Sequence, residues 1–283
     1  MSTVPRIAVV STRGIGPERG GRTANEDNYL ICQAGTARFL GATSEETVPV
    51  DGVGVLLAVA DGMGGHDHGA LASGAAVQAL SRLYRGGQPS DPELALHSFV
   101  LRAHRRLQTR ARERGAANMG TTLTAIWLFG DRLYWVHVGD SRLYLSRGGQ
   151  LRQITRDHTR GEFAQRDGRK QPPGADALTQ NFIFGSRSLG DDAGIRVDAG
   201  TDTGELRLLP GDRLMLCSDG VHGYLAEARI ASVLAEDATP AEASRRMVEE
   251  SVAVGSDDNI TVLVVAVGTV RSLDAEQPEY ELF

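Results

Sequence analysis

Residues 122–155 read TLTAIWLFGDRLYWVHVGDSRLYLSRGGQLRQIT and carry the strongest fold signal in the chain. Runs rich in β-branched and aromatic residues are separated there by Gly130-Asp131 and by Gly148-Gly149, two dipeptides typical of tight hairpin turns. The stretch therefore predicts antiparallel strands. In all, ten apolar runs of strand length are expected to form strands: 6–11, 28–32, 55–60, 122–129, 132–138, 142–146, 151–155, 205–209, 213–217 and 260–267.

Four segments have the apolar spacing of amphipathic helices, and they fall into two pairs. The pairs are 68–85 with 92–114, and 226–236 with 240–253. Asp91-Pro92 and Thr239-Pro240 are natural helix starts, because a capping side chain precedes a proline at the first helical position. Strict alternation of strands and helices is missing, which argues against a doubly wound fold. The pattern predicts an α+β fold with largely antiparallel sheets and with helices outside them.

Composition excludes several classes of protein. The 283 residues include two cysteines, which lie far apart and indicate neither a disulfide framework nor a zinc finger. The longest apolar runs are far shorter than the ~18 residues that span a bilayer, so no membrane association is expected. The N-terminal sequence lacks a signal-peptide pattern, so a cytoplasmic location is expected. The net charge is −6, and half of that excess lies in 271–283, so nucleic acid is not an expected partner.

The chemically informative feature is an acidic residue beside glycine at the end of a predicted strand. The strand 55–60 runs into Asp61-Gly62, followed by Met63 and two more glycines. Glycine allows close approach of the backbone, so a backbone carbonyl can act as a ligand beside the Asp61 carboxylate. Oxygen ligands of this kind suit a hard divalent cation such as Mg²⁺ or Mn²⁺. A simple turn after the strand is the alternative.

Acidic residues flank four other predicted strands, and these are Asp140, Asp219, Asp258 and the pair Glu26 and Asp27. If the strands share a sheet, several of the acids can converge at one edge. Clustered carboxylates repel one another unless a cation neutralises them, so convergence would favour a bound metal. Independent turns remain the alternative for this larger set.

Arg22 lies four residues before Glu26. An isolated arginine next to acids is most often a surface ion pair. Beside a metal cluster, the same arginine is the expected bidentate ligand of a phosphate oxygen. Metals combined with a phosphate-binding arginine indicate hydrolysis of a phosphoester.

Seven short motifs in this chain resemble, in order, those of a known family. They are Arg22-x-x-Asn-Glu-Asp27, Asp61-Gly-Met-Gly-Gly-His66, Gly120-Thr-Thr122, Val138-Gly-Asp-Ser-Arg142, Ile154-Thr-Arg-Asp-His158, Ser218-Asp-Gly220 and Asp258-Asn-Ile-Thr261. The resemblance is to the metal-dependent protein phosphatase family, the type 2C serine/threonine phosphatases, in its bacterial form. It covers about residues 6–268. It implies a four-layer α-β-β-α sandwich of two antiparallel sheets flanked by helix pairs.

The resemblance also implies a set of metal ligands. Asp61 would bridge two Mn²⁺ or Mg²⁺ ions. Glu26 and the carbonyl of Gly62 would bind one of these ions, and Asp219 and Asp258 would bind the other. A hydroxide that bridges the two metals would attack phosphoserine or phosphothreonine in a protein, in line with the leaving oxygen.

Three further roles are implied in the same way. Asp27 would hydrogen-bond water held by the metals, and Arg22 would hold the substrate phosphate. Asp140 matches the position that helps to bind a third, weaker ion in bacterial members.

The chain departs from the family pattern in two places. Met63 stands where many eukaryotic members have a histidine that is proposed to protonate the leaving group, so the general acid stays open, although His66 and His68 lie nearby. The segment 159–181 occupies the position of the family's flap, and its Gly, Pro and charged residues predict a mobile loop.

The sequence predicts one catalytic domain over 1–268 and a short acidic tail over 269–283. Expected partners are phosphorylated protein substrates and a cognate serine/threonine kinase, and a monomer is expected. Two alternatives remain: a catalytically silent pseudophosphatase that acts as a regulatory binding module, and a phosphoesterase that acts on other phospho-substrates.

Overall fold

Two six-stranded sheets form the centre of the molecule. The computed structural model describes residues 3–38, 44–49, 54–63, 67–113, 119–166 and 202–269, together with Gly168, Lys170, Gln171 and Gly174. The first sheet has the strand order β11 (Gln150–Gln153), β10 (Arg142–Arg147), β13 (Arg213–Cys217), β14 (Ile260–Thr269), β1 (Thr3–Thr12), β4 (Ser44–Pro49). The second sheet has the order β12 (Asp202–Arg207), β9 (Arg132–Val138), β8 (Leu123–Phe129), β5 (Val55–Ala60), β2 (Asn28–Gln33), β3 (Thr36–Arg38).

All paired strands of the described part of the chain are antiparallel, as the hairpin signals predict. A small third sheet joins β6 (Gly62–Met63) to β7 (Gly120–Thr121). The ten predicted strands are all present. Sequence reasoning missed β3, β4, β6 and β7, which are short or polar and carry no apolar run.

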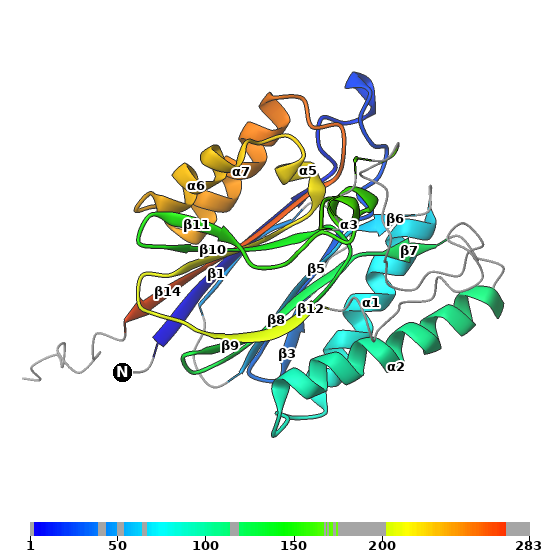
Figure 1. The fold of residues 1–283 in the computed structure, drawn as a ribbon, viewed down its shortest axis with the longest axis vertical. Helices are drawn as coiled ribbons and strands as arrows, with labels where there is room; N and C mark the ends of the chain where they lie inside the picture. Colours follow the sequence, from blue (N-terminus) through cyan, green and yellow to red (C-terminus); the bar gives the residue numbers. More distant parts are fainter. Residues whose placement is uncertain are drawn as a thin grey trace, which may run out of the picture.

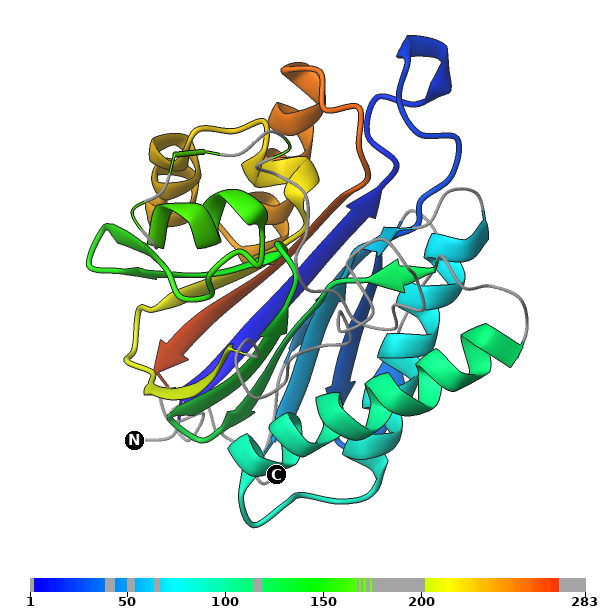
Figure 2. The same ribbon diagram turned by 45° about the vertical axis from the view of Figure 1, so that its right-hand side comes forward.

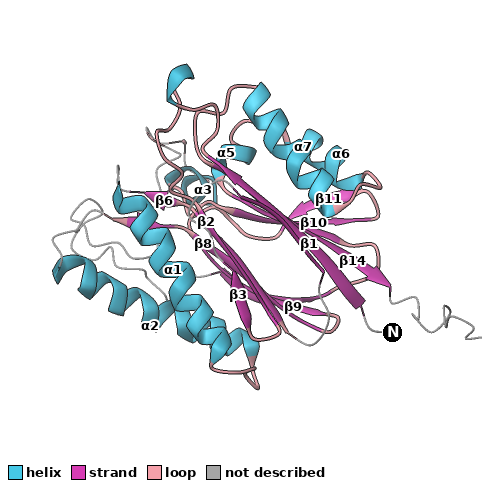
Figure 3. Cartoon of the chain, turned by 180° about the vertical axis from the view of Figure 1, so that it is seen from behind, coloured by secondary structure: helices cyan, strands magenta, loops and turns pink. Residues whose placement is uncertain are grey.

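Two pairs of helices cover the outer faces of the sheets (Figures 1 and 2). The pairs are α1 (Asp67–Arg85) with α2 (Pro92–Glu113), and α6 (Glu227–Ala235) with α7 (Pro240–Ala253). Figure 3 shows the strands between the two helix pairs, so the predicted four-layer sandwich is confirmed. Both predicted caps are present: Asp91 Oδ1 accepts a hydrogen bond from the Leu94 amide at 2.9 Å, and Thr239 forms a capping box with Glu242.

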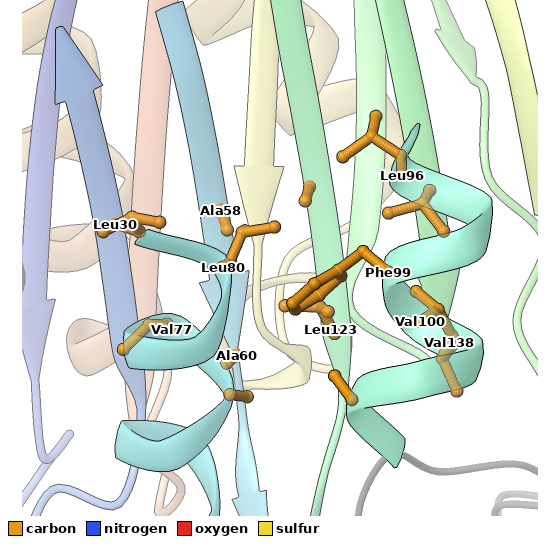
Figure 4. Packing of buried hydrophobic residues seen from close by; sticks show 14 of the residues in the cluster. Leu30, Ala58, Ala60, Val77, Leu80, Leu96, Phe99, Val100, Leu123 and Val138 are labelled. Atoms are coloured by element: carbon orange, nitrogen blue, oxygen red, sulfur yellow. The ribbon is translucent and has the colours of Figure 1, made fainter. Parts of the chain in front are cut away.

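Three apolar cores separate the four layers. One lies between the sheets, one between the second sheet and α1 and α2, and one between the first sheet and α6 and α7. Strand β5 contributes to two of them, because successive side chains point to opposite faces. Val55, Leu57 and Val59 face the first sheet, whereas Leu56 and its alternating neighbours face the helices. Figure 4 shows Ala58 beside Leu80 and Ala60 further along the same face of β5. Burial on both faces explains why the whole strand is apolar.

Three short elements complete the described structure: η1 (Pro17–Arg19), α3 (Arg160–Arg166) and α5 (Asp219–His222). The prediction of a loop over 159–181 is wrong for Arg160–Arg166, which form a helix that begins just after Thr159, whose hydroxyl accepts from the Glu162 amide at 3.3 Å. Most of the remaining flap, the three residues 64–66 and the tail after Thr269 lie outside the described residues. Among the helices that the structure describes, none has the length and apolar character to cross a bilayer.

An ion pair with a buried carboxylate joins β10 to the turn before β13. Arg147 contacts both carboxylate oxygens of Asp212, with Nε–Oδ1 at 2.8 Å and Nη2–Oδ2 at 2.7 Å. Asp212 is 1% exposed and also accepts from the Leu209 amide at 2.7 Å. Removing this carboxylate leaves a cation and an amide without their buried partner.

We expect Asp212→Ala to lower the free energy of unfolding by about 2 kcal/mol, because it removes the buried acceptor of the Leu209 amide and of Arg147. The matched control is Glu205→Ala, which removes the exposed partner of Arg132 and is expected to cost less than about 1 kcal/mol. Urea unfolding of both variants measures the difference. Equal losses in the two variants would contradict this account.

Candidate active site

The acidic strand ends meet at one end of the sandwich, but they come from both sheets. Antiparallel pairing places the end of each strand beside the start of its neighbour. In the second sheet this rule brings Asp61, after β5, beside Asp27, before β2, since Ala60 pairs with Asn28. In the first sheet it brings Asp219, after β13, towards Asp258, before β14, since Cys217 pairs with Val262. The acids therefore converge, although their strands do not all share one sheet: they come from two facing sheets.

We name this group the carboxylate cluster, and its members are Glu26, Asp27, Asp61, Asp140, Asp219 and Asp258. Figure 1 shows α5 and β6, which begin at two of its members or beside them, at the same end of the molecule. The two sheets contribute from opposite sides, so any bound ion would lie between the layers and not on one sheet's edge.

Asp27 is held from the opposite sheet. Its side chain is fully buried, and its Oδ2 atom accepts hydrogen bonds from the hydroxyls of Ser218 and Thr261, both at 2.7 Å. The alternation along β2, β13 and β14 turns these three side chains towards the space between the sheets. A donor chain supports Thr261: Asn25 Nδ2 donates to Ser11 Oγ at 2.9 Å, and Ser11 Oγ lies 2.8 Å from Thr261 Oγ1.

The backbone of Asp61 is fixed by two threonines. Its carbonyl accepts from the Thr121 hydroxyl at 2.8 Å and from the Thr122 amide at 2.9 Å. Its amide donates to Thr122 Oγ1 at 2.9 Å, and that hydroxyl lies 2.7 Å from Ser141 Oγ. With both backbone groups satisfied, the Asp61 carboxylate has a set position at the end of β5.

Glu26 packs against two glycines. A Cβ atom on Gly62 would lie 2.5 Å from the Glu26 carbonyl oxygen, and one on Gly69 would lie 2.7 Å from Glu26 Oε2. Only glycine fits at these close approaches. Asn259 holds the segment from the other side, since its Oδ1 accepts from the Glu26 amide at 2.8 Å and its Nδ2 donates to the Ala24 carbonyl at 2.9 Å.

Burial and mutual repulsion shift the pKa values of the cluster upwards. Burial raises the pKa of Asp61 well above its ordinary value, and the charges of Asp27 and Asp219 raise it further. Burial also raises the pKa of Asp140 to about 8, again with a contribution from Asp219. Burial likewise raises the pKa of Asp27 to about 7, even though the hydrogen bonds from Thr261 and Ser218 lower it. These groups resist ionisation when no cation is near.

Asp219 lies in the same electrostatic environment as Asp61. Burial and the nearby charge of Asp258 raise the pKa of Asp219, and the charge of Asp219 in turn raises the pKa of Asp61. A divalent cation would offset this mutual repulsion and favour the ionised carboxylates.

Arg22 stands beside this pair and binds Asp258. Its Nε and Nη2 atoms donate to the two carboxylate oxygens at 2.7 and 2.8 Å. The hydrogen bonds with Asp258 raise the pKa of the guanidinium. The Arg22 side chain is 55% exposed and that of Asp258 26%, so the arginine lies at the rim of the cluster. A planar, exposed guanidinium that already donates to two carboxylate oxygens is suited to bind a phosphate group.

The oxygens of the cluster fit a hard divalent cation. Asp27 Oδ1 and Asp219 Oδ1 are buried and meet no hydrogen-bond donor within the described parts of the chain. All potential ligand atoms of the carboxylate cluster are oxygens, which Mg²⁺ and Mn²⁺ prefer. Across those same parts, no three His, Cys, Asp or Glu side chains already surround one point closely enough to hold an ion. Arg22 occupies both carboxylate oxygens of Asp258, so this pair would open if Asp258 took a cation.

Several residues that position the site received no role from the sequence. Ser218, Thr261, Asn259 and Thr122 belong to the quoted motifs, but only the structure shows that they hold Asp27, Glu26 and Asp61. His222 lies outside those motifs and contacts the loop of Asp140, with Nε2 at 2.9 Å from the Asp140 carbonyl oxygen. Met63 is described in β6 and carries no acidic proton, so it cannot act as the general acid.

Known proteins are similar to this chain in sequence and in architecture. The chain is 37% identical over 213 residues to the serine/threonine protein phosphatase PstP of Mycobacterium tuberculosis, an alignment that covers 75% of this chain and 40% of PstP. The chain thus spans less than half of the length of that relative. It is 31% identical over 222 residues to the serine/threonine phosphatase Stp of Listeria innocua, which covers 74% of this chain and 83% of Stp.

The fold is similar to a crystal structure of the catalytic domain of PstP in complex with two manganese ions. The TM-score is 0.72 at 32% identity, and the match covers 95% of this chain and 100% of that domain. Residues 46–257 match the family model described as protein phosphatase 2C. The motifs, the layers and these likenesses agree: the chain belongs to the protein phosphatase 2C family.

Proposed function

We propose that this protein hydrolyses phosphoserine and phosphothreonine in protein substrates with the help of divalent cations bound by the carboxylate cluster. The observation that carries the proposal is the gathering of six acidic side chains at strand ends of two facing sheets, with Arg22 at the rim. The names of PstP and Stp as serine/threonine phosphatases support the same activity.

We propose the metal ligands that the family resemblance implies. Asp61 would lie between two ions, with Glu26 and the Gly62 carbonyl on one side and Asp219 and Asp258 on the other. Asp140 would serve a third, weaker ion. Mn²⁺ or Mg²⁺ suits this oxygen set, and the two manganese ions in the PstP catalytic domain favour Mn²⁺. Bound cations would supply Lewis-acid chemistry, which activates water and neutralises charge on the phosphoryl oxygens.

Asp27 would orient the attacking water. Its Oδ2 atom is saturated by the two hydroxyls from the opposite sheet, which leaves Oδ1 as the acceptor for a hydrogen of that water. Because Ser218 and Thr261 fix the carboxylate plane, the direction of the remaining lone pairs is set before substrate arrives.

Arg22 would bind the phosphate of the substrate. Asp258 presents two oxygens to Arg22 in the bidentate geometry that a phosphoryl group also offers. If Asp258 held a cation, the Arg22 guanidinium would be free to bind a substrate phosphate. Arg22 would then exchange one anionic partner for another.

The wider setting is proposed by the same likeness. We place the catalytic domain at residues 1–268 and a short acidic tail at 269–283. Its partners would be phosphorylated proteins and a cognate serine/threonine kinase that the enzyme opposes. We propose a cytoplasmic monomer.

We expect Asp61→Asn and Asp219→Asn each to lower kcat/KM for a phosphothreonine peptide in Mn²⁺ by on the order of 10³-fold, since each removes a charged metal ligand. The matched control is Asp131→Asn, an exposed aspartate paired with Arg207, which should keep full activity. Released phosphate is measured together with circular dichroism of each variant.

Three results of this assay would contradict parts of the proposal. Wild-type rates in Asp61→Asn would exclude the metal mechanism. Absence of Mn²⁺ binding in calorimetry would favour the silent regulatory module. Hydrolysis of small phosphoesters without any hydrolysis of phosphopeptides would favour a phosphoesterase with other substrates.

Arg22→Ala should raise KM for the phosphopeptide and the inhibition constant of inorganic phosphate by similar factors of about 10–100, because charged hydrogen bonds to the phosphate are lost. Arg19→Ala is the control on the same loop, where the side chain donates only to the Ile15 carbonyl at 3.4 Å. A fall in kcat with both constants unchanged would assign Arg22 another role.

Without metal, the stability of the protein should fall as pH rises from about 6.5 to 8. The pKa of Asp140 is about 8 and that of Asp27 about 7 in the folded state, above the value of ~3.9 for an unfolded aspartate, so the folded state binds more protons. His137 and His222, whose pKa values burial lowers to about 4, oppose this trend only below about pH 6.5.

Urea unfolding in EDTA measures this dependence. Asp140→Asn should reduce the slope, and saturating Mn²⁺ should abolish it, because a cation favours the ionised carboxylates. A flat profile in EDTA, or an unchanged slope in Asp140→Asn, would show that these groups do not titrate as described.

A further inference from the structure

His222 links the helix that begins at Asp219 to the loop that carries Asp140. It is the last residue of α5, and its Nε2 atom lies 2.9 Å from the Asp140 carbonyl oxygen. A carbonyl oxygen only accepts hydrogen bonds, so Nε2 carries the hydrogen and donates it. Asp219 follows β13 of the first sheet, whereas Asp140 follows β9 of the second. Asp140 also lies just before β10, whose Arg142 pairs with Cys217 of β13, so the contact joins the turn between the two sheets to the helix at the neighbouring strand end.

The two acids joined in this way repel each other. Both are partly buried, and the charge of Asp219 acts directly on Asp140. Two like charges kept near one another move apart unless their backbones are restrained. A hydrogen bond between the backbone of one and the helix of the other is such a restraint, and its neutral donor leaves both negative charges for a cation.

The residues on either side of Asp140 are held by other groups. The His158 amide donates to the Gly139 carbonyl at 2.7 Å, and the Gly139 amide donates to His158 Nδ1 at 3.2 Å. Ser141 Oγ lies 2.7 Å from Thr122 Oγ1. These contacts tie the loop to neighbouring segments, whereas the His222 contact falls on Asp140 itself and ties it to α5.

We propose that His222 is a positioning residue that holds Asp140 at a fixed place relative to Asp219, so that the Asp140 carboxylate can serve the third, weaker cation beside the ion held by Asp219. The proposal rests on the metal-dependent function proposed above. His222 acts through the backbone of Asp140 and touches neither the cation nor the substrate. Groups that orient a metal ligand affect metal affinity by about 10–100-fold when they are removed.

Two substitutions separate the hydrogen bond from the bulk of the ring. In glutamine the amide nitrogen reaches about the place of Nε2, whereas in asparagine it reaches only about that of Nδ1. We expect His222→Gln to bind Mn²⁺ nearly as the unsubstituted chain does. His222→Asn should lose about tenfold in affinity at the weakest Mn²⁺ site, measured by calorimetry on the full chain without substrate.

Activity provides a second readout. The Mn²⁺ concentration for half-maximal phosphopeptide hydrolysis should rise in His222→Asn, while kcat at saturating Mn²⁺ recovers. The control is His97→Asn on α2, which should match the unsubstituted chain. If His222→Asn fails to fold, as urea unfolding in EDTA would reveal, His222→Met keeps similar bulk without a donor and takes its place.

A double-mutant cycle with Asp140→Asn tests the route of the effect. If His222 acts by placing the Asp140 carboxylate, His222→Asn should cause no further loss of Mn²⁺ affinity once that carboxylate is gone. Additive losses, or equal losses in His222→Gln and His222→Asn, would overturn the proposal. A chain that binds Mn²⁺ but hydrolyses no phosphopeptide contradicts the proposed function and leaves this test intact, whereas no Mn²⁺ binding overturns both.

Discussion

Mutual repulsion among buried carboxyl groups is the interaction to which the rest of this molecule responds. Unpaired charges in a low-dielectric interior are costly, and six acidic side chains approach one another at one end of the sandwich. The chain counters the repulsion with protons, with Arg22 on Asp258 and with hydroxyl donors on Asp27. Each of these partners is weaker than a divalent cation, so the cluster is stable enough to fold and still ready to bind metal.

The three cores make that arrangement rigid. Each carboxylate sits at the end of a strand, or beside it, and the strands are packed on both faces. Because close packing restricts the movement of the strands, it also restricts the side chains at their ends, although these lie outside the cores. Hydrogen bonds also connect the two sheets. Ser218 and Thr261 of the first sheet donate to Asp27 of the second and so fix the position of its carboxylate relative to the acids of the first sheet.

Much of this could be predicted from local sequence signals. Alternating and continuous apolar runs predict the ten main strands, and capping residues predict the starts of two helices. Strands β3 and β4 escaped because Thr36–Arg38 and Ser44–Pro49 lack an apolar run. Two sheets were expected, but local signals could not predict which strand belongs to which sheet. The order β10, β13, β14, β1 joins segments that are distant in sequence.

The acids of the site were likewise predictable, but their supports were not. An Asp-Gly pair after an apolar strand is a local pattern, whereas the contact of Ser218 with Asp27 joins residues 191 positions apart. The same holds for His222, which no motif distinguishes from an ordinary helical histidine. Local sequence patterns identify the acidic residues of the site. Only the tertiary fold shows which residues hold them in place.

The pairing of β1 with β14 has a consequence for how the protein is made. These strands come from opposite ends of the described chain and pair over their whole length, from Thr3 with Thr269 to Thr12 with Ile260. During synthesis on the ribosome, the middle of the first sheet stays open until the last strand emerges. Pairings this far apart in sequence form slowly, because closure of a long loop precedes them. Glu26 and Asp258 are separated in the same way, so a nascent chain cannot assemble the complete carboxylate cluster until β14 has been synthesised.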